Sequence, residues 1–492
     1  MTEQPLVSTT LGPVAGFWQG ESARFLGIPY AQPPVGDLRF AVPVAPEPWT
    51  EPLDATAYGP TAQRRGFGDG PSIIPEPSIP GAGTLNLNVF TPAPGGGAGL
   101  PVLVWIHGGG FIAGSAASPW YDGAAFNRDG VVLVSLGYRL GIEGFLHVEG
   151  APDNRGVLDW IAALTWVRDN IAAFGGDPAK VTIAGQSAGG GAVQTLLATP
   201  SARDLFRGAI SVSGAVMEPQ SRERGLAIAG MLTARTGTPA TVAALRDLSD
   251  DEMLALQDAV MAPEEGQAPL PDLVLAPFAD GELIPEQVPA AIRGGSASPV
   301  PLMLGATHHE FNMAAEFGMP DAPIELAHAL LGQVGLPADA VAEFVALHEG
   351  KAPATIIGQG LTDWLFRASA VRVAEDRAAL GLPTWLYAFE WLSAGPMLPG
   401  KAFHCLDLPF AFDLLDAEGA ELQTGPDAPR KLADAMHGAW VAFIRDLDPG
   451  AAWPRYTAEQ RSTQIWDTDS SVAADFYGPE RAIWSRLETP EA

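Results

Sequence analysis

The sequence predicts an α/β fold in which a large, mostly parallel, twisted sheet is flanked by helices. Two observations lead to this prediction. Short apolar runs alternate with segments of helical period between residues 101 and 215. These runs are rich in branched apolar residues, as strands buried on both faces are. Alternating strands and helices favour parallel strands that are covered by helices on both sides.

The elements follow one another regularly from residue 101. Helices are expected over 156–174, where Gly175 and Gly176 end the apolar period, and over 188–198, before Pro200. Helical patterns dominate from about 216 to 380, which predicts helical capping insertions. No shift in composition divides the chain, so we expect a single domain over 1–492. Strands are expected over six apolar runs, at 101–107, 131–139, 180–184, 208–213, 301–305 and 384–391.

Composition limits the partners of the chain. Its 492 residues include 57 acidic and 28 basic side chains, which give a net charge of −29. Phosphate backbones and anionic membranes would repel such a chain, so we expect neither as a partner. Residues 1–20 lack the pattern of a signal peptide, and a lone cysteine, Cys405, allows no intramolecular disulfide. We expect a cytoplasmic protein, either a monomer or a homodimer.

A nucleophile motif lies between a predicted strand and a predicted helix. Residues 185–189 (GQSAG) match G-x-S-x-G, which places Ser187 on a sharp turn between flanking glycines. The N-terminus of the following helix favours negative charge that develops near this serine. A glycine turn without a catalytic role is the alternative, because the chain contains 56 glycines.

A second glycine-rich segment strengthens the catalytic interpretation. Residues 107–110 (HGGG) follow the first predicted strand, and their glycines expose backbone N–H groups that could bind an oxyanion. Each motif alone could be a plain turn, but coincidence of both in this order is improbable. His107 is expected to shape the loop rather than to titrate in catalysis.

These motifs and the segments around them resemble the type-B carboxylesterase family, which has the α/β-hydrolase fold. The resemblance implies a hydrolase of neutral carboxylic esters that acts through an acyl-enzyme, with a small-molecule ester as its partner and no cofactor or metal. It runs almost end to end, through residues 25–40 (FLGIPYAQPPVGDLRF), 85–92, 101–114, 135–146, 154–190, 277–285, 305–310, 404–412 and 453–456.

Carried over residue by residue, the resemblance implies a catalytic triad of Ser187, Glu310 and His404. A serine hydroxyl needs a base to take its proton, and histidine suits that role because it titrates near neutrality. Glu310 would hold the tautomer of the imidazole and stabilise the imidazolium. Glu316 is the alternative acid nearby. The matching backbone donors of the oxyanion hole are Gly109, Gly110 and Ala188.

Departures from the family pattern bear on the substrate. Gln186 lies where many relatives have Glu, so we expect weaker attraction for cationic esters. Ala82-Gly83-Thr84 replace the usual acidic pair and a cysteine, so Arg39 needs another partner. No tryptophan lies between Trp49 and Trp105, which argues against an aromatic platform for choline.

Four further positions carry expectations. Arg139 and Asp159 match family positions with structural roles, and we expect them to be buried partners. Phe311 follows Glu310 where glycine is usual, which puts the local turn in question. Cys405 follows the candidate base, and we expect it to be a packing residue, although its thiol could sensitise activity to bulky reagents.

Other function classes fit parts of the sequence. The same triad could hydrolyse carbamates or activated amides, and an interaction protein without activity could share the fold. A metal-dependent hydrolase could use His308-His309, but adjacent residues on a strand point to opposite faces and no HExxH motif occurs. The sequence does not select the natural ester, its acyl and alcohol groups, the stereoselectivity or the oligomeric state.

Overall fold

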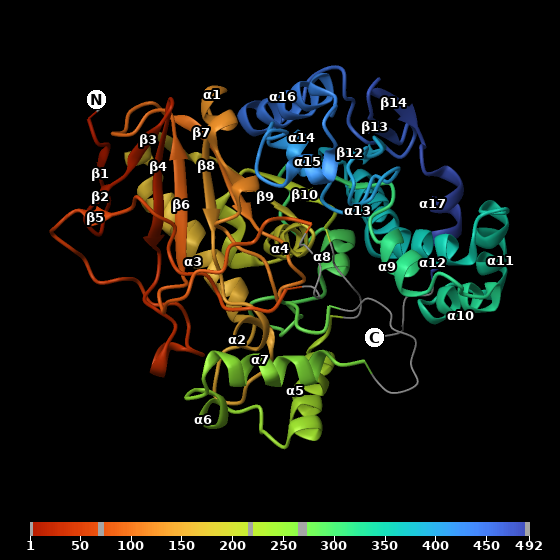
Figure 1. The fold of residues 1–492 in the computed structure, drawn as a ribbon, viewed down its shortest axis with the longest axis horizontal. Coiled ribbons are helices and arrows are strands. Elements are labelled where there is room, and N and C mark those ends of the chain that lie inside the picture. Colours follow the sequence, from red (N-terminus) through yellow and green to blue (C-terminus); the bar gives the residue numbers. More distant parts are fainter. Residues whose placement is uncertain (1–2, 67–72, 215–219, 264–272, 488–492) are drawn as a thin grey trace.

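The computed structural model describes residues 3–66, 73–214, 220–263 and 273–487. Within this part, eleven strands form one sheet in the order β14-β13-β12-β11-β10-β9-β7-β8-β6-β4-β3 (Figure 1). The strands from β13 to β8 in this order pair in parallel, and β14, β6, β4 and β3 add antiparallel edges. The sheet is therefore large and mostly parallel, as predicted.

The six predicted strands are all present, with shifted ends. Two of them differ most: the predicted 131–139 is β8, Val132–Leu136, and the predicted 180–184 is the longer β9, Gly176–Gln186. The other strands of the sheet are β3 Phe17–Gln19, β4 Ser22–Pro29, β6 Asn86–Thr91, β7 Leu100–Ile106, β10 Gly208–Val212, β11 Leu302–Thr307, β12 Thr384–Phe389, β13 Ser462–Trp466 and β14 Ser471–Ala474.

Eight described strands were not predicted. Three of them, β1 (Leu6–Ser8), β2 (Pro13–Ala15) and β5 (Leu53–Asp54), form a small separate sheet beside the β3–β4 edge (Figure 1). The other five lie toward the two sides of the large sheet, with β6, β4 and β3 at one side and β13 and β14 at the other. Most of these strands are short or mix polar with apolar residues, so they lack the continuous apolar run that identifies a central parallel strand.

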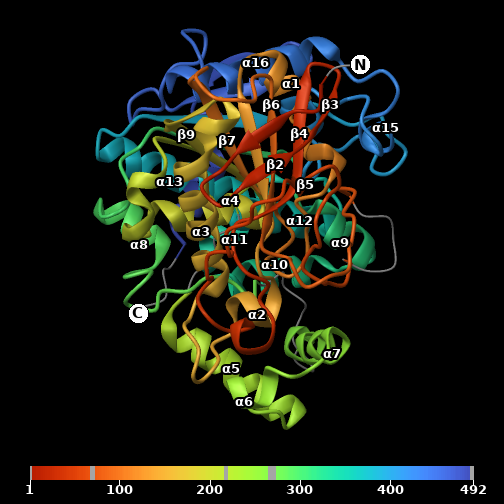
Figure 2. The same cartoon turned by 90° about the vertical axis from the view of Figure 1, so that its left-hand side faces the viewer.

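Alternation along the strands places side chains in two cores. In β7, Val102, Val104 and Ile106 pack on one face of the sheet, and Leu103 and Trp105 pack on the other. Both faces are covered by helices (Figures 1 and 2), so the central strands are buried along their length. The first face is covered by α3 Arg155–Asn170, α4 Ala188–Leu197, α8 Val288–Gly294 and α13 Ala368–Ala379, and the second by α1 Ala124–Arg128, α14 Leu408–Ala411 and α16 Arg430–Asp446.

The remaining helices extend from the sheet. Three of them lie together at one end of the molecule in both views (Figures 1 and 2): α5 Arg222–Thr236, α6 Val242–Leu245 and α7 Asp250–Met261. Four others pack with α17 Gly478–Trp484 around a separate apolar cluster: α9 Asn312–Gly318, α10 Ile324–Gln333, α11 Ala338–Leu347 and α12 Pro353–Thr362. The short helices α2 and α15 span Gly141–Phe145 and Ala420–Thr424.

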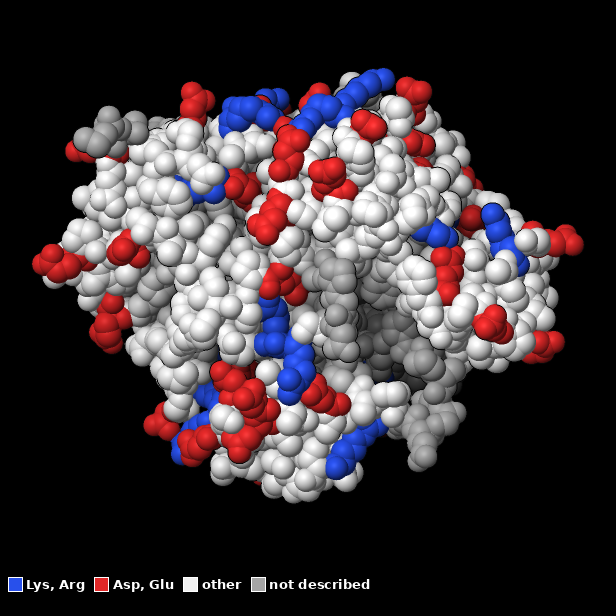
Figure 3. Space-filling model, viewed as in Figure 1, with Lys and Arg blue, Asp and Glu red and all other residues white. Residues whose placement is uncertain are grey.

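The surface carries the excess of acid. Figure 3 shows acidic side chains spread over one face, with arginine and lysine interspersed among them. Among the described residues, no helix is both long and apolar enough to cross a membrane.

Candidate active site

Ser187 lies on a strained turn between β9 and α4. Its φ of 59° and ψ of −124° fall in a region that residues with a side chain rarely adopt. The turn closes because its two flanking glycines have no side chain. A Cβ atom would lie 2.3 Å from the Gly189 carbonyl oxygen if placed on Gly185, and 2.1 Å from the Ile106 carbonyl oxygen if placed on Gly189. Ser187 is partly exposed, so its hydroxyl can be reached.

The structure brings Glu310 and His404 together. Glu310 follows β11 and is fully buried, and its Oε2 is hydrogen-bonded to Nδ1 of His404. Two donors hold the other carboxylate oxygen: the Ser213 hydroxyl at 2.6 Å and the Thr307 backbone N–H at 2.6 Å. A carboxylate with these partners fixes the imidazole so that Nδ1–H donates and Nε2 is free to accept.

Gln186 occupies the other side of the imidazole. Its buried amide nitrogen lies 3.0 Å from Nε2 of His404, which can accept its N–H. No hydrogen bond joins the Ser187 hydroxyl and His404 in this structure. Because Gln186 precedes Ser187 directly, the imidazole lies at the nucleophile turn, with the amide as its present partner.

Two phenylalanines pack against His404. The ring centroids of Phe311 and Phe366 lie 4.9 Å and 5.0 Å from that of the imidazole. Phe366 comes from a π-helical turn, Asp363–Arg367, which joins α12 to α13. The Phe311 backbone N–H donates to the Thr362 hydroxyl at 3.1 Å. This contact with the end of α12 holds the turn after Glu310, where Phe311 replaces the glycine that is usual in the family.

The HGGG loop passes directly over Ser187. A Cβ atom on Gly108 would lie 2.5 Å from the Gln186 carbonyl oxygen and 3.1 Å from Cβ of Ser187, and the first contact is too short for any residue but glycine. Gly109 and Gly110 have φ angles of 110° and 59°. Their N–H groups donate to no atom of the described chain, and neither does that of Ala188, the first residue of α4. Three free donors therefore lie on the loop and the helix end that adjoin the serine.

His107 supports this loop. Its Nδ1 donates to the Gly108 carbonyl oxygen at 2.8 Å, and its ring stacks on Tyr138 with centroids 4.5 Å apart. Burial, partly offset by that hydrogen bond, lowers the pKa of His107 to about 4. A neutral, buried ring agrees with the structural role that was expected.

Two buried titratable groups lie close to His404 in the chain: Cys405, which the sequence analysis considered, and Asp407, which it did not. Cys405 is 4% exposed, and burial together with the charges of Glu310 and Asp407 raises its pKa well above the usual value. Asp407 was not singled out. It accepts from the Tyr387 hydroxyl at 2.9 Å, and burial followed by the nearby charge of Glu310 raises its pKa to about 7.

The structure shows the partners of Arg39 and Arg139. Arg39 pairs with Glu143 through Nε, and its Nη1 donates to the Arg246 carbonyl oxygen at 3.2 Å. Arg139 and Asp159 form a bidentate pair with N–O distances of 2.7 and 2.9 Å, and both side chains are almost fully buried. Arg139 and Asp159 are thus the buried partners that were expected.

The expected geometry of His308 and His309 is wrong. Both lie beyond the end of β11, in a turn, and their ring centroids are 4.3 Å apart instead of on opposite faces. His308 pairs with Glu390 at 2.6 Å, and His309 accepts from the Ala402 N–H at 3.1 Å. Among the residues that the structure describes, no group of three or more His, Cys, Asp or Glu side chains could hold a metal ion.

Glu316, the alternative acid, lies on α9 away from the imidazole contact. Its carboxylate pairs with Lys401 at 2.7 Å and accepts from the Thr355 hydroxyl at 3.0 Å. Sequence reasoning missed Ser213 and Phe366, which contact Glu310 and His404. Neither belongs to a local motif, and each reaches the site only through the fold.

Comparisons with known proteins cover nearly the whole chain. The model of the carboxylesterase family matches residues 3–484. The para-nitrobenzyl esterase of Bacillus subtilis is 36% identical over 96% of this chain and 97% of its own length. A phenmedipham hydrolase of Pseudarthrobacter oxydans is 34% identical, over 98% and 99%. The solved structure of a Geobacillus stearothermophilus carboxylesterase superposes with a TM-score of 0.85 at 33% identity, covering 98% of this chain and 100% of that one.

Proposed function

Because the chain belongs to the carboxylesterase family, and is thereby a serine hydrolase of carboxylic esters, we propose that Ser187, Glu310 and His404 are its catalytic triad. The observation that carries this proposal is the arrangement around His404. One ring nitrogen is bound to a buried carboxylate, and the other faces the residue that precedes a strained serine.

The proposed reaction begins with the Ser187 hydroxyl. Its oxygen attacks the ester carbonyl while Nε2 of His404 takes its proton, and the imidazolium is stabilised by Glu310. This transfer requires the Ser187 hydroxyl to replace the Gln186 amide at Nε2. His404 then protonates the leaving alcohol, and water attacks the acyl-enzyme by the reverse path.

The negative charge of the tetrahedral intermediate develops on the former carbonyl oxygen. We assign its binding to the N–H groups of Gly109, Gly110 and Ala188, which have no other acceptor in the described chain. Donors that are fixed before the reaction cost no reorganisation when the charge forms. In the proposed single domain, we assign the acyl and alcohol pockets to the helical segments that the structure describes within 220–263 and 273–380.

The test of the triad combines labelling and substitution. A fluorophosphonate is expected to label the protein once, at Ser187, and Ser187→Ala and His404→Gln are expected to lower kcat on a para-nitrophenyl ester by about 10⁴-fold or more. Ser201→Ala, at an exposed serine outside both the triad and the HGGG loop, serves as the control for labelling. Labelling at another residue, or full activity in Ser187→Ala, would overturn the assignment.

Neutral esters are the proposed substrates. Gln186 puts a neutral amide where a carboxylate would attract cations, so Gln186→Glu is expected to raise kcat/KM for a cationic ester relative to a neutral ester of equal size. Equal discrimination in both proteins would contradict this role. The relative that is named a phenmedipham hydrolase makes phenmedipham the second candidate substrate to assay, beside ester and anilide analogues.

The cytoplasm is the proposed compartment, since the lone Cys405 gives the fold no disulfide that would need oxidising conditions. A fusion to a fluorescent protein that appears outside the cytoplasm would argue against it. The oligomeric state, monomer or homodimer, can be read from sedimentation.

A further inference from the structure

A largely buried ion pair lies beside the HGGG loop, between two residues outside the segments that resemble the family. Arg64 and Glu76 approach with Nε and Oε2 3.6 Å apart, and their side chains are only 4% and 15% exposed. Arg64 also donates through Nη2 to the backbone oxygens of Glu76, at 2.6 Å, and Pro77, at 3.1 Å. The guanidinium therefore fixes both the side chain and the backbone of residues 76–77.

Residues 76–77 in turn hold the end of the loop. The Ser115 hydroxyl donates to the Pro77 carbonyl oxygen at 2.9 Å. The Gly114 backbone N–H faces the Glu76 carboxylate and opposes the rise in its pKa that burial causes. Two consecutive residues of the loop thus adjoin two consecutive residues of a distant segment, one through a hydrogen bond and the other through the attraction between an N–H group and a carboxylate.

The loop end is in direct contact with the loop start. A Cβ atom on Gly114 would lie 2.1 Å from the Gly108 carbonyl oxygen and 2.2 Å from Nδ1 of His107. Gly108 is also the residue that passes over Ser187, as described above. A shift of Gly114 would therefore move the backbone that carries the free N–H groups of Gly109 and Gly110.

The charges of Glu76 and Arg64 act on titratable groups near the HGGG loop and His404. The Glu76 carboxylate contributes to the raised pKa of Tyr138, after burial, and to that of Cys405, after burial and nearer carboxylates. An unbalanced negative charge here would oppose the oxyanion. The Arg64 guanidinium contributes, after burial, to the lowered pKa of His107, so a compensating positive charge acts at the same place.

We propose that Glu76, held and neutralised by Arg64, is a positioning residue that fixes Gly114 and through it the Gly109 and Gly110 donors of the oxyanion hole. This inference rests on the proposed function, since it concerns how the same site stabilises its intermediate. Small displacements of such donors matter, because their effect depends on distances set before the reaction.

The experiment measures kcat, KM and the Ki of a trifluoromethyl ketone, whose adduct with the serine carries the oxyanion. Glu76→Ala is expected to lower kcat about 10- to 100-fold, less than loss of a direct donor, with KM changed less than about twofold. The Ki is expected to rise by the same factor as kcat falls. Glu76→Gln retains a side-chain oxygen that can face the Gly114 N–H and is expected to keep most of the activity that Glu76→Ala loses.

The neighbouring pair supplies the matched control. Arg65 and Asp258 form an ion pair at 2.7 Å in which both side chains are 53% exposed, so Arg65→Met is expected to leave all three constants unchanged. Arg64→Met leaves the Glu76 charge unbalanced, and adding Glu76→Gln to it is expected to recover activity. A merely structural role would not produce that recovery or the parallel change in Ki.

Two results would overturn the proposal. One is a folded Glu76→Ala protein with the kcat and Ki of the wild type, and the other is a loss in kcat without any rise in Ki. Labelling of wild-type Ser187 by the fluorophosphonate separates these results from failure of the triad. A wild-type protein that is not labelled at Ser187 rejects the proposed function itself, whatever Glu76→Ala does.

Discussion

Among single residues, Asp159 makes contacts whose loss is expected to lower the stability of the protein. It is fully buried and balances the equally buried Arg139 through two short N–O contacts. Asp159→Asn would leave the guanidinium without a counter-charge, and we expect the free energy of unfolding to fall by about 3–5 kcal/mol. Denaturant unfolding followed by circular dichroism measures it. Asp169, on the same helix, pairs with Arg168 in the solvent, and an equal loss in Asp169→Asn would contradict the role of burial.

Cys405 is expected to be inert in the folded protein. Thiolate is the reactive form of cysteine, and both the burial and the raised pKa of this thiol oppose it. We expect bulky maleimides at pH 7 to leave Cys405 unmodified and activity unchanged until the protein is denatured. Mass spectrometry after timed labelling tests this, and rapid modification of the native protein would count against the structure.

His107 couples stability to pH. Its pKa falls from 6.5 in the unfolded chain to about 4 in the folded protein. Between these values the unfolded state binds more protons, so the free energy of unfolding falls as pH drops from 6.5 toward 4, by at most about 3 kcal/mol. His107→Phe, which can still stack on Tyr138, is expected to flatten this dependence in urea titrations. His328→Gln, at an exposed histidine, is expected to leave the slope unchanged.

The residues of the site were predictable to different degrees. Ser187 and the HGGG loop are visible as local motifs, whereas Glu310 and His404 were assigned only through resemblance, because spacing does not select one of eight histidines. Ser213, Phe366 and Glu76 were missed. Ser213 lies 97 positions from the carboxylate that it binds, and a contact of that kind has no signature in the linear order.

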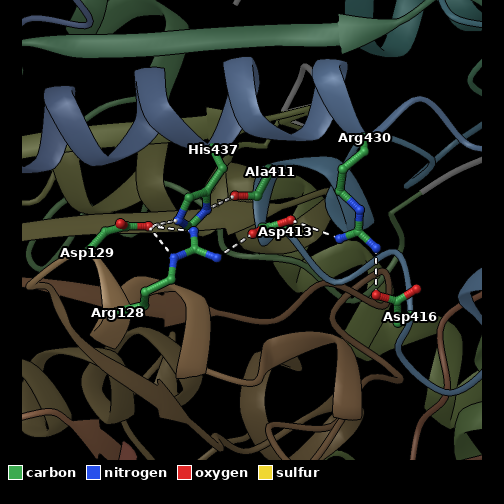
Figure 4. Close-up of polar contacts among 7 residues, drawn as sticks. All are labelled: Arg128, Asp129, Ala411, Asp413, Asp416, Arg430 and His437. Carbon is green, nitrogen blue, oxygen red and sulfur yellow. Dashed lines mark hydrogen bonds and ion pairs between the residues drawn. The ribbon is translucent and has the colours of Figure 1, made fainter. Parts of the chain in front are cut away.

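At the scale of elements, a polar network joins α1, α16 and the segment that follows α14 (Figure 4). Buried His437 on α16 contacts the Ala411 carbonyl oxygen at 2.9 Å and Asp129 at 3.1 Å. Asp413 accepts from Arg128 at 2.8 Å and from Arg430 at 3.3 Å. These contacts join α14 and the residue Asp413 that follows it to α1 and α16, on the face of the sheet where Leu103 and Trp105 pack.

Asp413 is the centre of this network, and its side chain is 8% exposed. Because both arginines are half in solvent, we expect Asp413→Asn to destabilise the protein by only about 1 kcal/mol, and less in high salt. Thermal melts at two salt concentrations measure this. Asp416 also pairs with Arg430 but is 88% exposed, so Asp416→Asn is the control. If Asp416→Asn lowers the stability more than Asp413→Asn does, the more buried carboxylate is not the more important one, which would contradict this prediction.

The elements that were predicted share one physical property. Central strands such as β10 and β11 are buried on both faces and are composed mostly of small or apolar residues, which the sequence shows as short apolar runs. The strand β4, which lies between β3 and β6, was missed because its register is broken between Phe25 and Ile28, which hides its alternation. The π-helical turn after α12 was also unpredictable, since one extra residue in a turn leaves no periodic signal.

At the scale of the whole molecule, the net charge of −29 opposes compaction. Screening weakens this repulsion, because the Debye length shrinks from about 30 Å at 0.01 M salt to about 8 Å at 0.15 M. We therefore expect Tm to rise by a few degrees when NaCl is raised from 10 to 150 mM. Differential scanning calorimetry at fixed pH measures the rise. A constant or falling Tm would show that attractive ion pairs outweigh the repulsion.

The wide separation of Ser187, Glu310 and His404 along the chain has a consequence during synthesis. The serine leaves the ribosome long before β12 and His404, the proposed base, which follows it, so the serine turn can form before the proposed base has been synthesised. A stalled nascent chain that ends before β12 should therefore ignore a fluorophosphonate. Reactivity should begin only after the last of the three has emerged and folded, which protects a growing polypeptide from premature acylation.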